Sequence, residues 1–248
     1  MLENASTTRR RRAKLSNKKL SLKIDGRDII ADEGKTILET ATKNGIEIPH
    51  LCFLEGLTNT GACRLCLVEL KGQARLFASC STPISDGMEV VTDSPVLKEY
   101  RKNTVQLLLS ERTHICSVCV ANKKCELQSY ADKLGVDHVA FEREWTHEEI
   151  DATHPFLVID RNRCILCTRC IRVCDEIEGV HTLDLKLRGK DSQVITDFDD
   201  PWGKSTSCTS CRKCAKVCPV GAIYVEGEPL SETKDSSIAK FVLSRRKK

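Results

Sequence analysis

The sequence predicts an α+β fold made of three successive cysteine-containing modules between two basic tails. The first module has short strands paired at glycine turns, the second has helical spacing of apolar residues, and the third contains one cysteine pattern twice. The expected boundaries are 1–19 for the N-terminal tail, 20–93, 94–137 and 138–228 for the modules, and 229–248 for the C-terminal tail.

The first module, 20–93, is expected to be β-rich. Residues 20–31 predict a hairpin that turns at an Asp-Gly pair. Thr36 is a suitable cap for a short helix after this hairpin. A second hairpin over 65–79 and one further strand complete a mixed module that ends near Thr92.

The second module is expected to be helical. Ser94 and Pro95 have the character of an N-cap and a first helical residue, and apolar residues then recur at helical intervals. The segment ELQSYADKLGV, after a cysteine-rich turn, predicts another helix.

The fifteen cysteines are the strongest signal in the sequence. No apolar segment follows the N-terminal arginines as in a signal peptide, and no stretch approaches the roughly 18 apolar residues of a membrane span. We therefore expect a cytoplasmic protein without a transmembrane segment; any contact with a membrane would be peripheral and made through partners. In such a reducing compartment, clustered cysteines indicate metal ligands rather than disulfides.

The third module repeats the pattern C-x2-C-x2-C-x3-C, which is that of bacterial ferredoxins with two [4Fe–4S] clusters. In that pattern the first three cysteines of a run bind one cluster and the fourth binds the other. Structural zinc is the alternative, but zinc sites usually pair two separated knuckles. The expected sets are Cys164, Cys167, Cys170 and Cys218 for one cluster, and Cys208, Cys211, Cys214 and Cys174 for the other.

Four cysteines of the first module resemble the plant-type [2Fe–2S] loop, although the first gap is longer than in that spacing. Small residues at Gly61 and Ala62 would let backbone amides approach the cluster sulfurs. Zinc or unliganded thiols are the alternative. The expected ligands are Cys52, Cys63, Cys66 and Cys80.

The second module has only three cysteines, Cys116, Cys119 and Cys125, which is one ligand short of a [4Fe–4S] site. His114 lies two positions before Cys116, so both side chains project to the same side of an extended chain. We expect His114 to be the fourth ligand. The alternative is that His114 makes a local hydrogen bond and another group or solvent completes the site.

The charge distribution argues against a nucleic-acid-binding protein. Residues 1–19 hold seven Lys/Arg and one acidic residue, and 240–248 hold five Lys/Arg and none. The region between them has 27 Lys/Arg and 34 Asp/Glu, so its net charge is negative and does not favour phosphate binding. Both basic ends are expected to be disordered and solvated.

The order of these sites resembles that in three related families. They are the large iron–sulfur subunit of respiratory NADH dehydrogenase, the N-terminal half of iron-only hydrogenases, and the gamma (diaphorase) subunit of the bidirectional NAD-reducing nickel–iron hydrogenase. The resemblance covers about 20–228 and includes the turn of the H…CSVC…CELQ type. The gamma subunit is the best match, because this chain stops about 30 residues after Cys218 and His114 has the short spacing typical of gamma subunits.

The resemblance implies an N-terminal plant-type [2Fe–2S] β-grasp domain, a small helical His/Cys3 [4Fe–4S] module and a C-terminal bacterial two-[4Fe–4S] ferredoxin-like domain. It also implies partners, namely a flavin- and NAD(H)-binding diaphorase subunit and the hydrogenase small and large subunits. The chain has no G-x-G-x-x-G turn for a dinucleotide and no cysteines left for a hydrogenase active site, so we expect a redox subunit without a substrate site. A corresponding subunit of another flavin-linked complex, such as an NADH or formate dehydrogenase, is the alternative.

Overall fold

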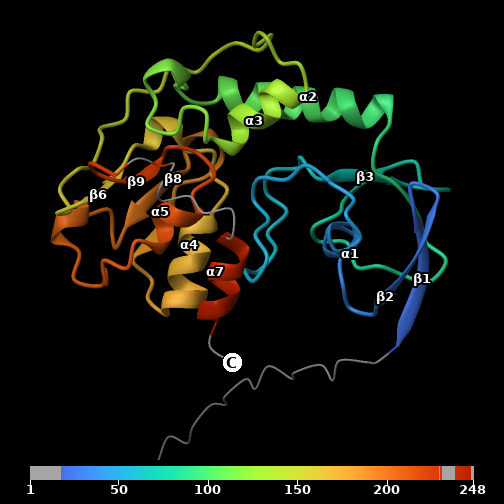
Figure 1. The fold of residues 1–248 in the computed structure, drawn as a ribbon. Helices are drawn as coiled ribbons and strands as arrows, with labels where there is room; N and C mark the ends of the chain where they lie inside the picture. The colour runs from blue at the N-terminus through green and yellow to red at the C-terminus, as the bar shows by residue number, and fades with distance from the viewer. Residues whose placement is uncertain (1–17, 229, 231–237, 247–248) are drawn as a thin grey trace, which may run out of the picture.

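The computed structural model describes residues 18–228, 230 and 238–246. The N-terminal sheet and the C-terminal domain lie at opposite ends of the molecule, and helices α2 (Pro95–Ser110) and α3 (Glu126–Lys133) lie along one side of both (Figure 1). The expected N-terminal basic tail lies almost wholly outside the described residues. Within the described ranges, no helix has the length and apolar character that crossing a membrane requires.

The N-terminal domain is a five-stranded mixed sheet with the order β2-β1-β5-β3-β4. Strands β1 and β5 are parallel, and the other neighbouring strands are antiparallel. The alternating side chains of β1 that face the core are buried, as expected for a sheet covered on one face. The strands are β1 (Lys19–Ile24), β2 (Arg27–Asp32), β3 (Leu67–Leu70), β4 (Leu76–Ala78) and β5 (Glu89–Val91).

Helix α1 (Ile37–Lys43) packs on this sheet and confirms the predicted Thr36 cap. The Thr36 hydroxyl accepts a hydrogen bond from the Glu39 amide, and the Glu39 carboxylate accepts one from the Thr36 amide. This reciprocal pair satisfies two amides that the helix leaves free. The sheet and α1 form the predicted β-grasp domain.

The helical module begins as predicted, with Ser94 as the N-cap of α2 and Pro95 as its first residue. Between α2 and α3 the chain makes a cysteine-containing turn that includes the short 3-10 helix η1 (Cys116–Val118). Val105 of α2 and Leu127 of α3 are buried in one core with Leu51 of the N-terminal domain and Leu157 of the C-terminal domain.

The C-terminal domain consists of two similar halves. Its strands β6 (Leu157–Ile159) and β9 (Ile223–Val225) pair antiparallel, and helices α4 (Arg169–Val173) and α5 (Lys213–Val217) each begin one residue before the third cysteine of a run. A π-helical turn, η3 (Cys174–Glu178), continues α4. The remaining short 3-10 helices are η2 (Arg161–Arg163), η4 (Gly189–Asp191) and η5 (Trp202–Lys204).

The hydrophilic insertion between the two repeats folds as a hairpin of β7 (Leu183–Lys186) and β8 (Gln193–Thr196). Leu183 and Val194 of this hairpin are buried in the same core as Leu51, Val105 and Leu127. The [2Fe–2S] loop, the helical module and the C-terminal domain therefore contribute to one common core, while the N-terminal sheet and α1 have a core of their own.

The expectation that the C-terminal tail is solvated is wrong for part of it. Helix α7 (Ile238–Arg245) lies beside α4, and its Val242 is fully buried against Leu54, Leu57 and Val173 (Figure 1). Most of the positive charges follow the apolar residues of this helix. Burial of apolar surface, such as that of Val242, stabilises the packed position of the helix.

Candidate metal centres

The four cysteines predicted to hold the [2Fe–2S] cluster form one buried group. Side-chain hydrogen bonds join Cys52 to Cys63 and to Cys80, and Cys66 to Cys80. The bond with Cys80 lowers the pKa of Cys66 to about 7, and the bond with Cys52 raises the pKa of Cys63. Hydrogen bonds that lower the pKa of a thiol favour its thiolate form, which is the form that binds metal.

Backbone amides also lie close to the sulfur atoms of this cysteine group. The amides of Ala62 and Cys63 bond to the Cys52 sulfur, and the Leu51 amide lies 3.4 Å from the Cys63 sulfur. Gly61 has a φ of 62°, a left-handed conformation that most side chains disfavour. These amides would stabilise negative charge on bound sulfur.

The ligand set of the helical module lines one small cavity. His114, Cys116, Cys119 and Cys125 all contribute to its wall. Gly221 of the C-terminal domain closes the cavity, and a Cβ at that position would lie 2.9 Å from the Cys119 sulfur. The site therefore depends on contact between two modules.

His114 has the environment of a neutral nitrogen ligand. Its Nε2 atom is buried and has no hydrogen-bond partner within the described part of the chain. Burial lowers the pKa of His114 to about 4, so the ring is neutral at pH 7. A buried nitrogen atom without a partner is costly, and coordination of a metal would satisfy it.

The cysteine runs of the C-terminal domain are interleaved in space. One small cavity is lined by the first three cysteines of the first run together with Cys218 of the second. Another is lined by the first three cysteines of the second run together with Cys174 of the first. The structure thus brings together the two crossed sets that the repeat predicted.

The backbone conformation of the two runs also repeats. Leu166 and Thr168 have φ values of 52° and 58°, and the matching Ser210 and Arg212 have 56° and 61°. These left-handed residues curl each run around its cavity, and the Leu166 amide approaches the Cys164 sulfur at 3.4 Å. Strained backbone shared by two repeats of one chain points to a functional constraint.

One polar neighbour of these cysteines was not predicted from the sequence. The buried Trp202 indole donates to the Cys208 sulfur at 3.4 Å. Its ring lies 5.5 Å from that of His154, whose Nε2 pairs with Ser210 Oγ. Trp202 lies outside the cysteine motif, so its position six residues before Cys208 was the only sequence signal.

The cysteine sets suit clusters better than single ions. Within residues 18–228, 230 and 238–246, no three His, Cys, Asp or Glu side chains converge closely enough to hold one metal ion. Structural zinc needs four ligands at about 2.3 Å from a common centre. Ligands spread around the three cavities instead fit a [4Fe–4S] cluster, which binds each ligand through a different iron atom.

Three family models match the chain in succession. Residues 17–95 match a 2Fe-2S iron-sulfur cluster binding domain, and 101–140 match the NADH-ubiquinone oxidoreductase-G iron-sulfur binding region. Residues 154–224 match the ferredoxin-like domain of NADH-quinone oxidoreductase subunit 3. The chain therefore contains one [2Fe–2S] domain followed by regions of the [4Fe–4S] type.

Similar full-length proteins are oxidoreductase subunits. The chain is 35% identical over 90% of its length to the NADPH-Fe(3+) oxidoreductase subunit alpha of Geobacter sulfurreducens, and 34% identical over 88% to the NADP-reducing hydrogenase subunit HndD of Solidesulfovibrio fructosivorans. It spans only 26% and 38% of those two relatives. A solved structure of NAD+-reducing [NiFe]-hydrogenase contains a chain with 34% identity and a TM-score of 0.80, and the match covers 86% of this chain and 89% of that one.

Proposed function

Because the chain belongs to the iron–sulfur family that includes this chain of NAD+-reducing [NiFe]-hydrogenase, we propose that it transfers electrons inside an oxidoreductase complex. The single observation that carries the proposal is the arrangement of the cysteines. One buried group and three cavities each gather a complete predicted ligand set. The module boundaries 20–93, 94–137 and 138–228 belong to the proposal.

The proposed ligands define one [2Fe–2S] and three [4Fe–4S] clusters. Bound in these sites, such clusters supply one-electron oxidation and reduction. The ligand sets are Cys52, Cys63, Cys66 and Cys80; His114, Cys116, Cys119 and Cys125; Cys164, Cys167, Cys170 and Cys218; and Cys208, Cys211, Cys214 and Cys174.

The protein side chains around the sites do three things. Apolar residues such as Leu65 and Ile159 exclude water, amides and the Trp202 indole donate to sulfur, and the shared core fixes the sites relative to one another. Exclusion of water and preset donors reduce the reorganisation that accompanies a change of charge. This is what an electron-transfer protein requires.

The partners in the proposal are a flavin- and NAD(H)-binding subunit on one side and the small and large subunits of a hydrogenase on the other. The similarity to a chain of NAD+-reducing [NiFe]-hydrogenase over most of both chains supports them. Substrate chemistry would then take place on the partners, and this chain would be a non-catalytic subunit located in the cytoplasm.

A second candidate is the corresponding position in an NADH dehydrogenase. The descriptions of two matching family models name that enzyme, and an NADH-quinone oxidoreductase chain of Rhizobium meliloti is 35% identical over 82% of this chain. The chain covers only 24% of that relative. Identification of the chains that copurify with this one separates the two candidates.

Metal analysis of the anaerobically reconstituted chain tests the proposal. The four sites predict about 14 iron atoms and as much acid-labile sulfide per chain. The protein should accept electrons from dithionite and should oxidise neither hydrogen nor NADH. Zinc in place of iron, or only about four iron atoms per chain, would contradict the proposed clusters.

A further inference from the structure

Two arginines of α4 reach from the C-terminal domain into the [2Fe–2S] loop. Arg169 and Arg172 are three residues apart, so they lie on one face of the helix. Both are buried, with exposed fractions of 2% and 7%. They bind the carbonyl oxygens of consecutive residues: Arg172 binds that of Cys52 and Arg169 that of Phe53.

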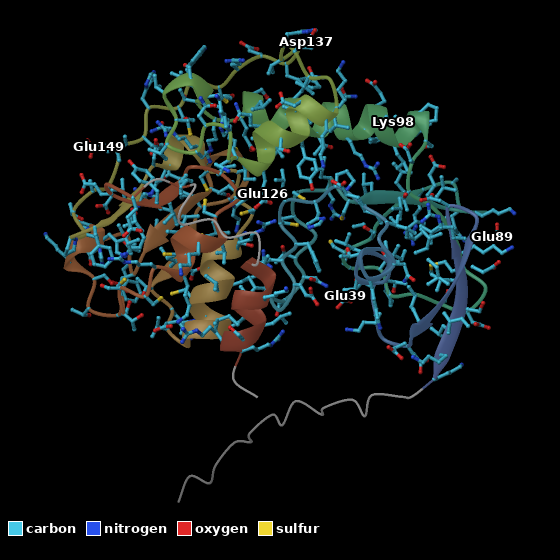
Figure 2. The ribbon with its side chains drawn as sticks, in the orientation of Figure 1. Glu39, Glu89, Lys98, Glu126, Asp137 and Glu149 are labelled. Carbon is cyan, nitrogen blue, oxygen red and sulfur yellow. The ribbon has the colours of Figure 1, made fainter. Side chains whose placement is uncertain are left out.

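The charge of Arg169 is balanced by a carboxylate. Glu126 of α3 accepts two hydrogen bonds from its guanidinium, at 2.8 and 3.0 Å. Figure 2 shows Glu126 at the junction of the helical module with the other two domains. This pair joins all three modules and adds no net charge to the junction.

The charge of Arg172 has no such partner. Its guanidinium donates five hydrogen bonds, all of them to neutral oxygen atoms; in the described part of the chain no carboxylate pairs with it directly, and the Glu176 carboxylate acts on its charge only from further away. The nearby Glu176 carboxylate accepts from the Thr58 amide instead. The acceptors are the carbonyls of Cys52 (2.6 Å), Thr58 (2.6 Å), Cys167 (3.0 Å) and Thr168 (3.3 Å), and the Thr168 hydroxyl (3.2 Å).

A buried cation is costly unless negative charge lies close to it. Two of the five acceptors belong to Cys52 and Cys167, which are proposed ligands of two different clusters. A cluster held by four thiolates carries net negative charge. The two clusters bound through Cys52 and Cys167 would therefore place negative charge on either side of the Arg172 guanidinium.

We propose that Arg172 is a positioning residue that bridges the [2Fe–2S] site and the first cubane site and serves as their shared counter-charge. This inference rests on the proposed function, because it requires both clusters. Its positive charge favours the reduced form of each cluster and so raises both midpoint potentials. Its hydrogen bonds fix the Cys52 loop against the Cys167 loop.

The internal repeat provides a matched control. Lys216 occupies in the second run the position that Arg172 occupies in the first, two residues after the third cysteine of the run. Lys216 is half-buried rather than buried. Lys216→Gln therefore removes the same charge at the related position of the repeat, away from the Cys52 carbonyl.

The test is redox titration of the full iron-loaded chain, monitored by electron paramagnetic resonance, for Arg172→Gln, Arg172→Lys and Lys216→Gln. Arg172→Gln should shift the midpoint potentials of the [2Fe–2S] cluster and of the first cubane to more negative values and leave the His114 site unchanged. Arg172→Lys retains the positive charge, so both midpoint potentials should stay close to those of the wild-type chain. Lys216→Gln should leave the [2Fe–2S] potential unchanged.

Unchanged potentials in fully loaded Arg172→Gln, or equal shifts in the Gln and Lys variants, would overturn the proposed counter-charge. If Arg172→Gln does not load iron, Arg172→Lys decides alone: wild-type potentials support the proposal and a clear negative shift at both sites contradicts it. Failure of the wild-type chain to bind about 14 iron atoms would instead refute the proposed function.

Discussion

The crossed ligand sets of the C-terminal domain make a sharp prediction about pairs of substitutions. Cys218 lines the cavity of Cys164, although 54 residues separate them, and not that of the nearer Cys214. Cys218→Ala and Cys164→Ala should therefore damage one and the same cluster. Each single variant should lose about four of about 14 iron atoms, since one cubane holds four.

The double variants then separate crossed from uncrossed ligation. Cys164→Ala with Cys218→Ala should lose no more iron than either single variant, about four atoms, whereas Cys214→Ala with Cys218→Ala should lose about eight. Where a three-iron remnant persists in the single variants, each of them loses only about one atom, and the second substitution in the same cluster releases the remaining iron, whereas Cys214→Ala with Cys218→Ala loses only about two atoms.

Iron and sulfide analysis of the purified single and double variants, with the low-temperature resonance spectrum of each, provides the measurement. Cys174→Ala serves as the matched control, because it should combine non-additively with Cys214→Ala instead. The reverse pattern, in which Cys214 and Cys218 variants are non-additive, would refute the crossed assignment.

Three further predictions concern single residues near the clusters. His114→Cys should retain a cubane whose midpoint potential is more negative, because a thiolate replaces a neutral ligand; an unaltered potential would mean that His114 is no ligand. Gly221→Ala places a methyl group 2.9 Å from the Cys119 sulfur and should cost about 1–3 kcal/mol in denaturant unfolding, with iron lost mainly from that site; full stability and iron content would contradict this. Trp202→Phe removes the donor to Cys208 and should lower the potential of that cluster by roughly 20–60 mV, the equivalent of a hydrogen bond of about 0.5–1.5 kcal/mol; an unchanged potential would mean that the 3.4 Å contact does not tune it.

The elements that followed from the sequence are those with local signals. The cap at Thr36 and the Ser94-Pro95 helix start each depend on residues within one turn, and the structure confirms both. The hairpins depend on short glycine turns between alternating strands. The fold class is confirmed for the same reason.

The candidate sites were predictable because ligand spacing and side-chain chemistry are visible in the sequence. Even the interleaved runs followed from the repeat, since two related halves place equivalent cysteines at equivalent positions. His114 was harder, because one histidine beside a cysteine has many possible roles. Its buried Nε2 without a partner is a property that appears only in the folded chain.

The features that the sequence did not predict depend on contacts between residues that lie far apart in the chain. Arg172 and Cys52 are 120 positions apart, and Val242 is buried because α7 packs against both the C-terminal domain and the [2Fe–2S] loop. The basic composition at the chain end favoured a solvated tail, yet burial of one apolar face outweighs that local tendency. Such contacts require the packing of whole modules, which no local pattern encodes.

The most direct test of the central claim, that this chain transfers electrons between active sites on other subunits, uses the native complex carrying Cys63→Ala. Three rates are measured: hydrogen-dependent reduction of NAD, reduction of a dye by NADH, and reduction of a dye by hydrogen. We predict that the first is abolished while the other two persist, because the partner cofactors are untouched. Hydrogen-dependent NAD reduction at the full rate would show that the Cys63 site is not on the electron-transfer path. Turnover of hydrogen or NADH by the isolated chain would contradict the central claim altogether.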